Sequence, residues 1–129
     1  PECGEVDILE LRGQEPHVVL GSLHGPGYSG GASVTNDLVL GDDANFTDGF
    51  HTYAVQWDPG RITWSVDGEV FHVAHSGSLP PAGRWVFDHP FFLLLNVAVG
   101  GNFVGNPAET TPLPAVMQVD WVRIYERVR

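Results

Sequence analysis

The sequence lacks the features that mark several common classes of protein. It has a single cysteine, Cys3, so the chain cannot form an internal disulfide, and its cysteine content says little about redox compartment. No apolar run reaches the ~18 residues of a membrane-spanning helix. No stretch keeps a helical period of apolar residues over the length of a helix. We therefore expect a protein that is neither helical nor a membrane partner.

Basic residues are also scarce. The chain has 16 acidic and 6 basic residues and a formal net charge of −10. A polyanion such as nucleic acid, or an anionic membrane surface, is therefore not expected as a partner. A neutral polymer is compatible with this charge, although the charge does not select one.

Glycine and proline are abundant, with 16 and 10 residues among 129. This content is typical of many short strands joined by turns, and the length suits one domain. The predicted fold class is all-β. Strands are expected at residues 5–12, 18–24, 32–40, within a meander from 51 to 73, at 91–99 and at 116–125. The phase of Trp57 and Trp64 in the meander predicts that both rings pack in a core.

Three carboxylates stand close together near the start of the chain, at Glu5, Asp7 and Glu10. In a regular strand Glu5 and Asp7 share one face, and Glu10 lies on the other. One extra residue, a β-bulge between Asp7 and Glu10, brings all three to the same side. Glu5 and Glu10 then lie roughly 13 Å apart at Cα. Two glutamate side chains can close this to the ~5–5.5 Å between carboxyl groups that retaining glycoside hydrolysis uses.

Two other interpretations of these acids remain open. They can form the solvated face of a strand in an acidic protein, or they can provide oxygen ligands for calcium. Like charges crowded on one strand face repel each other, so some compensating feature is expected beside them.

The acid strand, Gly4 to Glu10, resembles the active-site strand of family 16 glycoside hydrolases in the bulged form of the laminarinase-like endo-β-1,3-glucanases. Other segments resemble the same family in the same order. They are residues 24–30 (HGPGYSG), 50–57 (FHTYAVQW), 66–68 (VDG), 91–101 and 119–125 (VDWVRIY). The resemblance covers the whole chain, 1–129, and implies the C-terminal part of a single catalytic domain whose N-terminal part is missing.

The resemblance implies an antiparallel β-sandwich, a concanavalin-like jelly roll, with the acids lining a concave cleft. It implies a secreted enzyme that performs retaining endo-hydrolysis of β-1,3-glucan, with β-1,3-1,4-glucan as an alternative substrate. Glu5 is then the nucleophile and Glu10 the general acid and base. Asp7 holds the nucleophile in place.

The resemblance also assigns roles outside the acid strand. His24 and Asn96 are expected to contact substrate. Phe103, where many relatives carry tryptophan, offers a ring face without the indole donor. No cofactor is required for the chemistry. Asp120 is expected to help hold a structural calcium ion, with its other ligands in the N-terminal part.

Two rival functions come from other classes. One is a non-catalytic β-glucan-binding protein, but such proteins typically lose a catalytic glutamate, and this chain keeps Glu5, Asp7 and Glu10. The other is an inactive half-domain, in which residues 1–129 need an N-terminal partner fragment to complete the sheets.

Overall fold

The computed structural model describes residues 1–41 and 43–128, and it is an all-β structure. Its strands are β1 (Glu5–Leu11), β2 (Val18–His24), β3 (Val34–Val39), β4 (Tyr53–Asp58), β5 (Arg61–Val66) and β6 (Glu69–His75). Two short 3₁₀ turns, Gly30–Ala32 and Ser76–Ser78, are the only helices in the described part of the chain. None of them has the length or apolar character to cross a membrane. The strands predicted at 5–12, 18–24, 32–40 and within 51–73 are confirmed, with ends that differ by a few residues.

The turn chemistry of the sequence accounts for the tight hairpin between β5 and β6. Asp67 and Gly68 both adopt positive φ, at 52° and 87°. Two successive residues with positive φ make the turn whose twist matches that of the flanking strands. The β5–β6 hairpin therefore forms where the Asp-Gly pair predicts it.

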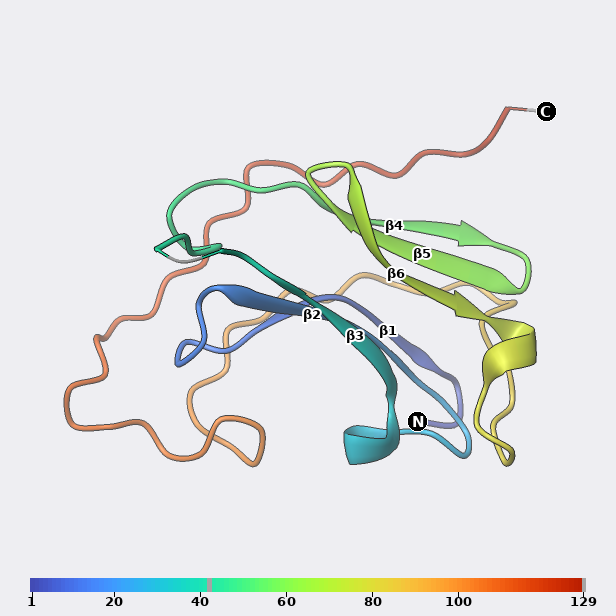
Figure 1. Ribbon diagram of the computed structural model, residues 1–129, viewed down its shortest axis with the longest axis horizontal. Coiled ribbons are helices and arrows are strands. Elements are labelled where there is room, and N and C mark those ends of the chain that lie inside the picture. Colours follow the sequence, from blue (N-terminus) through green and yellow to red (C-terminus); the bar gives the residue numbers. More distant parts are fainter. Residues whose placement is uncertain (42, 129) are drawn as a thin grey trace. The chain divides into compact units, whose positions relative to one another are not determined.

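The strands make two antiparallel three-stranded sheets, in the orders β1-β2-β3 and β4-β5-β6 (Figure 1). Both sheets contribute to a shared core made of two apolar clusters, in one of which Leu23 of β2 packs with Ile62 and Trp64 of β5. The sheets also meet at an edge, because the Asn36 side chain on β3 donates to the carbonyl of Phe71 on β6. This shared core holds β1 and β2 against the second sheet.

The two tryptophans of the meander behave differently. Trp64 is completely buried, which confirms the prediction for that residue. Trp57 is 45% exposed, and the prediction that it packs in the core is wrong. It lies one residue before the end of β4. There its indole N–H donates to the Phe87 carbonyl, and the ring makes an edge contact with Phe91.

Residues 92–129 form a second compact unit, and its described part, 92–128, contains no strand. In Figure 1 this segment, orange to red, runs as an irregular trace without arrows. The strands predicted at 91–99 and 116–125 are therefore absent, and that prediction is wrong for this structure. Many apolar side chains of the unit are exposed, with Phe92 at 82%. A strand needs backbone partners on a neighbouring strand, and in the described chain these segments have none.

Candidate active site

The site is organised by a β-bulge in β1. Asp7 pairs with Ser22 of β2 and Glu10 with Leu20, so the two residues Ile8 and Leu9 oppose the single residue Gly21. This is the extra residue that the spacing of the acids predicts, and the bulge is confirmed. Ser22 and Leu20 are two apart on β2 and share a face, so their partners Asp7 and Glu10 also share a face.

The opposite face of β1 belongs to the core. Val6, Leu9 and Leu11 pack against buried residues of the two apolar clusters. Glu5 pairs with His24 at the start of the strand and is exposed. The bulge therefore separates the acids from the apolar residues as the sequence predicts.

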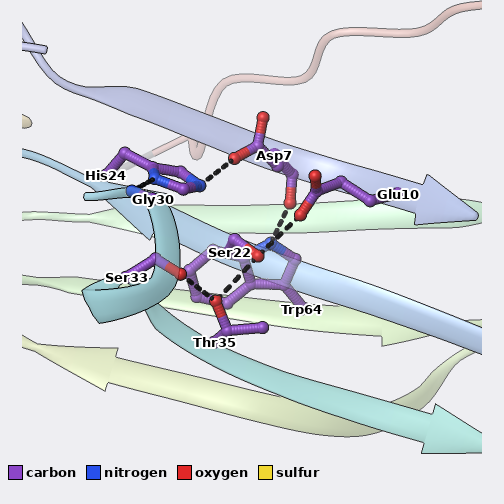
Figure 2. A network of polar contacts seen from close by, with 8 residues as sticks. All are labelled: Asp7, Glu10, Ser22, His24, Gly30, Ser33, Thr35 and Trp64. Carbon is purple, nitrogen blue, oxygen red and sulfur yellow. Dashed lines mark hydrogen bonds and ion pairs between the residues drawn. The ribbon is translucent and has the colours of Figure 1, made fainter. Parts of the chain in front are cut away.

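Trp64 contacts the bulge from the core side of the sheet. Its indole N–H donates to the backbone carbonyl of Asp7, with N and O 2.9 Å apart (Figure 2). The ring comes this close because the residue opposite the bulge is Gly21, where a Cβ atom would lie only 2.5 Å from Trp64 Cδ1. A residue with a side chain at position 21 would push the ring away from Asp7. The backbone of the bulge is thus tied to the core of the second sheet.

Asp7 is the carboxyl group most affected by this arrangement. Its side chain is only 19% exposed. Burial, followed by the charges of Glu10 and Glu5 and a side-chain hydrogen bond with Glu5, raises the pKa of Asp7 to about 7. At neutral pH, Asp7 therefore carries a proton for much of the time. A protonated Asp7 can donate to the Glu5 carboxylate, and its neutral form relieves the like-charge repulsion.

His24 lies beside Asp7 in a defined tautomer. The Gly30 N–H donates to Nδ1 of His24, so the ring hydrogen resides on Nε2. Nε2 is 3.1 Å from Asp7 Oδ2 (Figure 2). That oxygen is buried without an aligned hydrogen bond in the described part of the chain, so the contact is a close approach rather than a strong bond. The predicted site residue His24 is thus next to the acids.

Glu10 is held by β2 as well. The hydroxyl of Ser22 donates to Glu10 Oε2 at 2.8 Å, and the hydroxyl of Thr35 on β3 donates to Ser22 Oγ at 2.9 Å. Ser22 is 1% exposed. Sequence reasoning did not single out Ser22, although a signal was present. It is two residues before His24 in the same strand and shares the face of the acids.

The remaining predicted site residues lie in the second unit. Asn96, Phe103 and Asp120 are exposed there. Their roles in substrate and calcium binding stay predictions. Among the described residues, the only group with metal-ligand spacing is Asp7, Glu10 and His24, so Asp120 belongs to none.

The geometry also bears on the calcium interpretation of the acid strand. Ligand atoms of Asp7, Glu10 and His24 lie within 4.8 Å of one another. Calcium takes about six to eight oxygen ligands, whereas this group offers two carboxylates and an imidazole. Asp7 and Glu10 on one strand face, with Glu5 at the strand start, are also carboxyl groups of the kind that a glycosidase uses.

Comparison with known proteins agrees with this class. Residues 1–123 match the family model described as Glycosyl hydrolases family 16. The chain belongs to this family.

Solved and curated relatives are similar over nearly all of the chain. The laminarinase catalytic domain from Thermotoga maritima is 45% identical, with a TM-score of 0.80, over 88% of this chain and 46% of that chain. The endo-β-1,3-glucanase from Pyrococcus furiosus is 42% identical, with a TM-score of 0.80, over 88% and 44%. Glucan endo-1,3-beta-glucosidase A1 of Niallia circulans is 37% identical over 95% of this chain and 19% of its own length. The chain spans less than half the length of each.

Proposed function

We propose that this chain carries the catalytic strand of a retaining endo-β-1,3-glucanase. The observation that supports this most strongly is the bulged strand β1, which presents Asp7 and Glu10 on one face with Glu5 at its start. This strand belongs to a chain that is 45% identical to a laminarinase catalytic domain over the part they share. β-1,3-1,4-glucan is the alternative substrate.

In the proposed reaction Glu5 attacks the anomeric carbon while Glu10 protonates the leaving oxygen. Glu10 then removes a proton from the water that hydrolyses the glycosyl-enzyme ester. Asp7, protonated for much of the time at neutral pH, donates a hydrogen bond to Glu5 and keeps its carboxylate oriented. The three carboxyl groups interact, so the site titrates as a coupled set.

The rest of the proposal follows the same family resemblance. The acids line the concave cleft of a jelly roll, where His24, Asn96 and Phe103 contact the glucan. Asp120 takes part in a structural calcium site outside the cleft. Secretion is proposed because a polysaccharide substrate is too large to enter a cell intact.

Replacing Glu5 with glutamine tests the assignment of the nucleophile. Glu5→Gln keeps the shape of the side chain but makes a poor nucleophile. In samples that all contain the part of the Thermotoga maritima laminarinase domain that this chain does not match, turnover on laminarin should therefore fall by about a thousandfold or more. Glucan binding should remain. A control of equal charge change is Glu69→Gln, because Glu69 is exposed at the start of β6 in the other sheet.

Covalent trapping makes the test specific. A 2-deoxy-2-fluoro laminaribioside with a good leaving group should add one glycosyl unit to the peptide containing Glu5, as seen by mass spectrometry. Glu5→Gln should show no such adduct. A variant that kept a tenth of the parent turnover, or an adduct on another residue, would exclude Glu5 as the nucleophile.

A further inference from the structure

A row of hydrogen-bonded hydroxyl groups ends on Glu10, and the contacts determine which group is the donor in each bond. Thr35 donates its single hydroxyl hydrogen to Ser22 Oγ, and Ser22 donates its own to Glu10 Oε2. Ser33 Oγ lies 2.7 Å from Thr35 Oγ1. Because the Thr35 hydrogen is already used, Ser33 is the donor in that contact. The contacts form a continuous line that ends on Glu10 (Figure 2), and along it each hydroxyl group donates toward Glu10.

The fold builds this chain across three strands. Ser22 pairs with Asp7 on one side and with Thr35 on the other, so the three side chains form one row across the sheet. Glu10 pairs with Leu20 and is the diagonal neighbour of Ser22. The bulge brings Glu10 to this face, where it meets a serine that is fully buried.

Hydroxyl groups that donate in sequence polarise one another, so the last bond of the row is strengthened. It is also a bond to a carboxyl group, and such bonds are stronger than neutral ones when the group is ionised. Oε2 of Glu10 is thereby kept as an acceptor. A proton on Glu10 must then reside on the other oxygen, Oε1.

We propose that Ser22 is a positioning residue that reserves Oε1 of Glu10 for proton transfer. This rests on the proposed function. Oε1–H gives its proton to the glycosidic oxygen as the bond to the anomeric carbon breaks. Oε1 later takes a proton from water as the water oxygen bonds to that carbon and the ester bond between the carbon and Glu5 breaks. The Ser22 hydrogen stays on Ser22 throughout, and Thr35 and Ser33 keep its hydroxyl oriented.

The test compares substrates that differ only in how much they need an acid. Phenyl β-laminaribioside has a poor leaving group, whereas 2,4-dinitrophenyl β-laminaribioside has one that departs without protonation. The ratio kcat/KM reports the steps up to glycosyl transfer for both. A structural defect lowers both values equally, but a misplaced Glu10 lowers only the first.

Ser22→Ala should lower kcat/KM for the phenyl substrate roughly tenfold or more, the value of a hydrogen bond to a charged group. For the dinitrophenyl substrate the loss should stay below about threefold. Ser22→Thr, which keeps the hydroxyl, should have a kcat/KM for the phenyl substrate close to that of the parent. Thr35→Val removes the next hydroxyl at an exposed position and should show the same pattern more weakly. Ser65→Ala on β5 is the control in the other sheet. Equal losses on both substrates, or none, would overturn the proposal.

A measurement without substrate separates this proposal from the proposed function. In the full 129-residue chain carrying ¹³C-labelled glutamate, the Glu10 carboxyl signal is identified by its absence in Glu10→Gln. Loss of the Ser22 donor favours the protonated carboxyl, so this signal should titrate at higher pH in Ser22→Ala than in the parent. An unchanged titration overturns the role of Ser22 whatever the activity. A parent that cleaves neither substrate even when mixed with the part of the Thermotoga maritima laminarinase domain that it does not match overturns the proposed function, while the titration still decides whether Ser22 acts on Glu10.

Discussion

Asp7 retains a proton at pH values where an ordinary aspartate is ionised, because it is buried and lies between two other carboxyl groups. The folded protein therefore binds more protons than the unfolded chain between the ordinary pKa of 3.8 and the folded pKa of about 7. Stability from this residue is complete below that window and is lost as the pH rises through it. This loss of stability at neutral pH accompanies the role proposed for Asp7, whose proton forms the hydrogen bond to Glu5.

Asp7→Asn should therefore stabilise the protein in a pH-dependent way. Near pH 4 the variant and the parent should melt at similar temperatures. At pH 8 the variant should melt about 4 °C higher or more, since it has no buried charge to accommodate, and roughly 1 kcal/mol produces such a change. Thermal unfolding at the two pH values measures the difference. Turnover should fall because an amide holds Glu5 less well.

Asp67→Asn is a control whose effect on stability should depend on pH in the opposite direction. A hydrogen bond from His51 lowers the pKa of Asp67, so its stabilising contribution is present at neutral pH and lost as the pH falls. This variant should be less stable than the parent at neutral pH, with the deficit shrinking in acid. A melting difference for Asp7→Asn that does not change with pH would contradict the assigned protonation.

At the scale of the strand, two deletions in β1 distinguish the need for the bulge from the need for the acids to share one face. Ile8 and Leu9 together oppose Gly21, and Leu9 is the one packed against the core. Deleting Ile8 removes the extra residue, leaves Leu9 opposite Gly21, and keeps Asp7 and Glu10 on one face. Deleting Val6 instead places Glu5 and Asp7 on opposite faces.

We expect the Ile8 deletion to keep turnover within roughly a hundredfold of the parent, the usual cost of a catalytic group displaced by about 1 Å. The turnover of the Val6 deletion should fall to the background rate measured without enzyme. Laminarin hydrolysis and thermal unfolding of both deletions provide the measurement. Equal inactivation of two folded deletions would show that the bulge itself, rather than the shared face, is required.

At the scale of the whole molecule, the second unit is the notable feature. Its apolar residues are the kind that strands use, yet they are exposed, and the described residues 92–128 form no ladder. Exposed apolar segments of this size usually mark a surface that another part of a protein covers. The solved relatives are about twice as long as the segment that this chain matches. We propose that strands from such additional sequence pair with residues 92–128.

The chain of residues 1–129 alone should accordingly release little reducing sugar from laminarin. Activity should return when it is mixed with the part of the Thermotoga maritima laminarinase domain that it does not match. Circular dichroism of the mixture should show more strand than the sum of the separate samples. A cooperative melt together with full activity from the chain alone would exclude this idea.

Much of the first unit could be predicted from the sequence because its determinants are local. Alternation of apolar residues placed β4 and β5, and the Asp67-Gly68 pair placed the hairpin between β5 and β6. The spacing of Glu5, Asp7 and Glu10 predicted the bulge, since only an extra residue brings three such acids to one side. The exposure of Trp57 was missed because alternation gives the phase of a side chain but not how far the core extends along the strand.

What the sequence could not decide depends on partners distant along the chain. Residues 91–99 and 116–125 have the composition of strands, but a strand exists only when another backbone satisfies its hydrogen bonds. The proton on Asp7, the tautomer of His24 and the donor to Glu10 likewise follow from tertiary contacts. They depend on the burial of Asp7 beside Glu10 and Glu5, on Gly30 donating to His24 and on Ser22 donating to Glu10, once the strands pair and β2 packs against β5. The sequence by itself determined which acids share a face, and the tertiary structure decided which of their oxygens hold protons, because burial and hydrogen bonding arise only when the sheets come together.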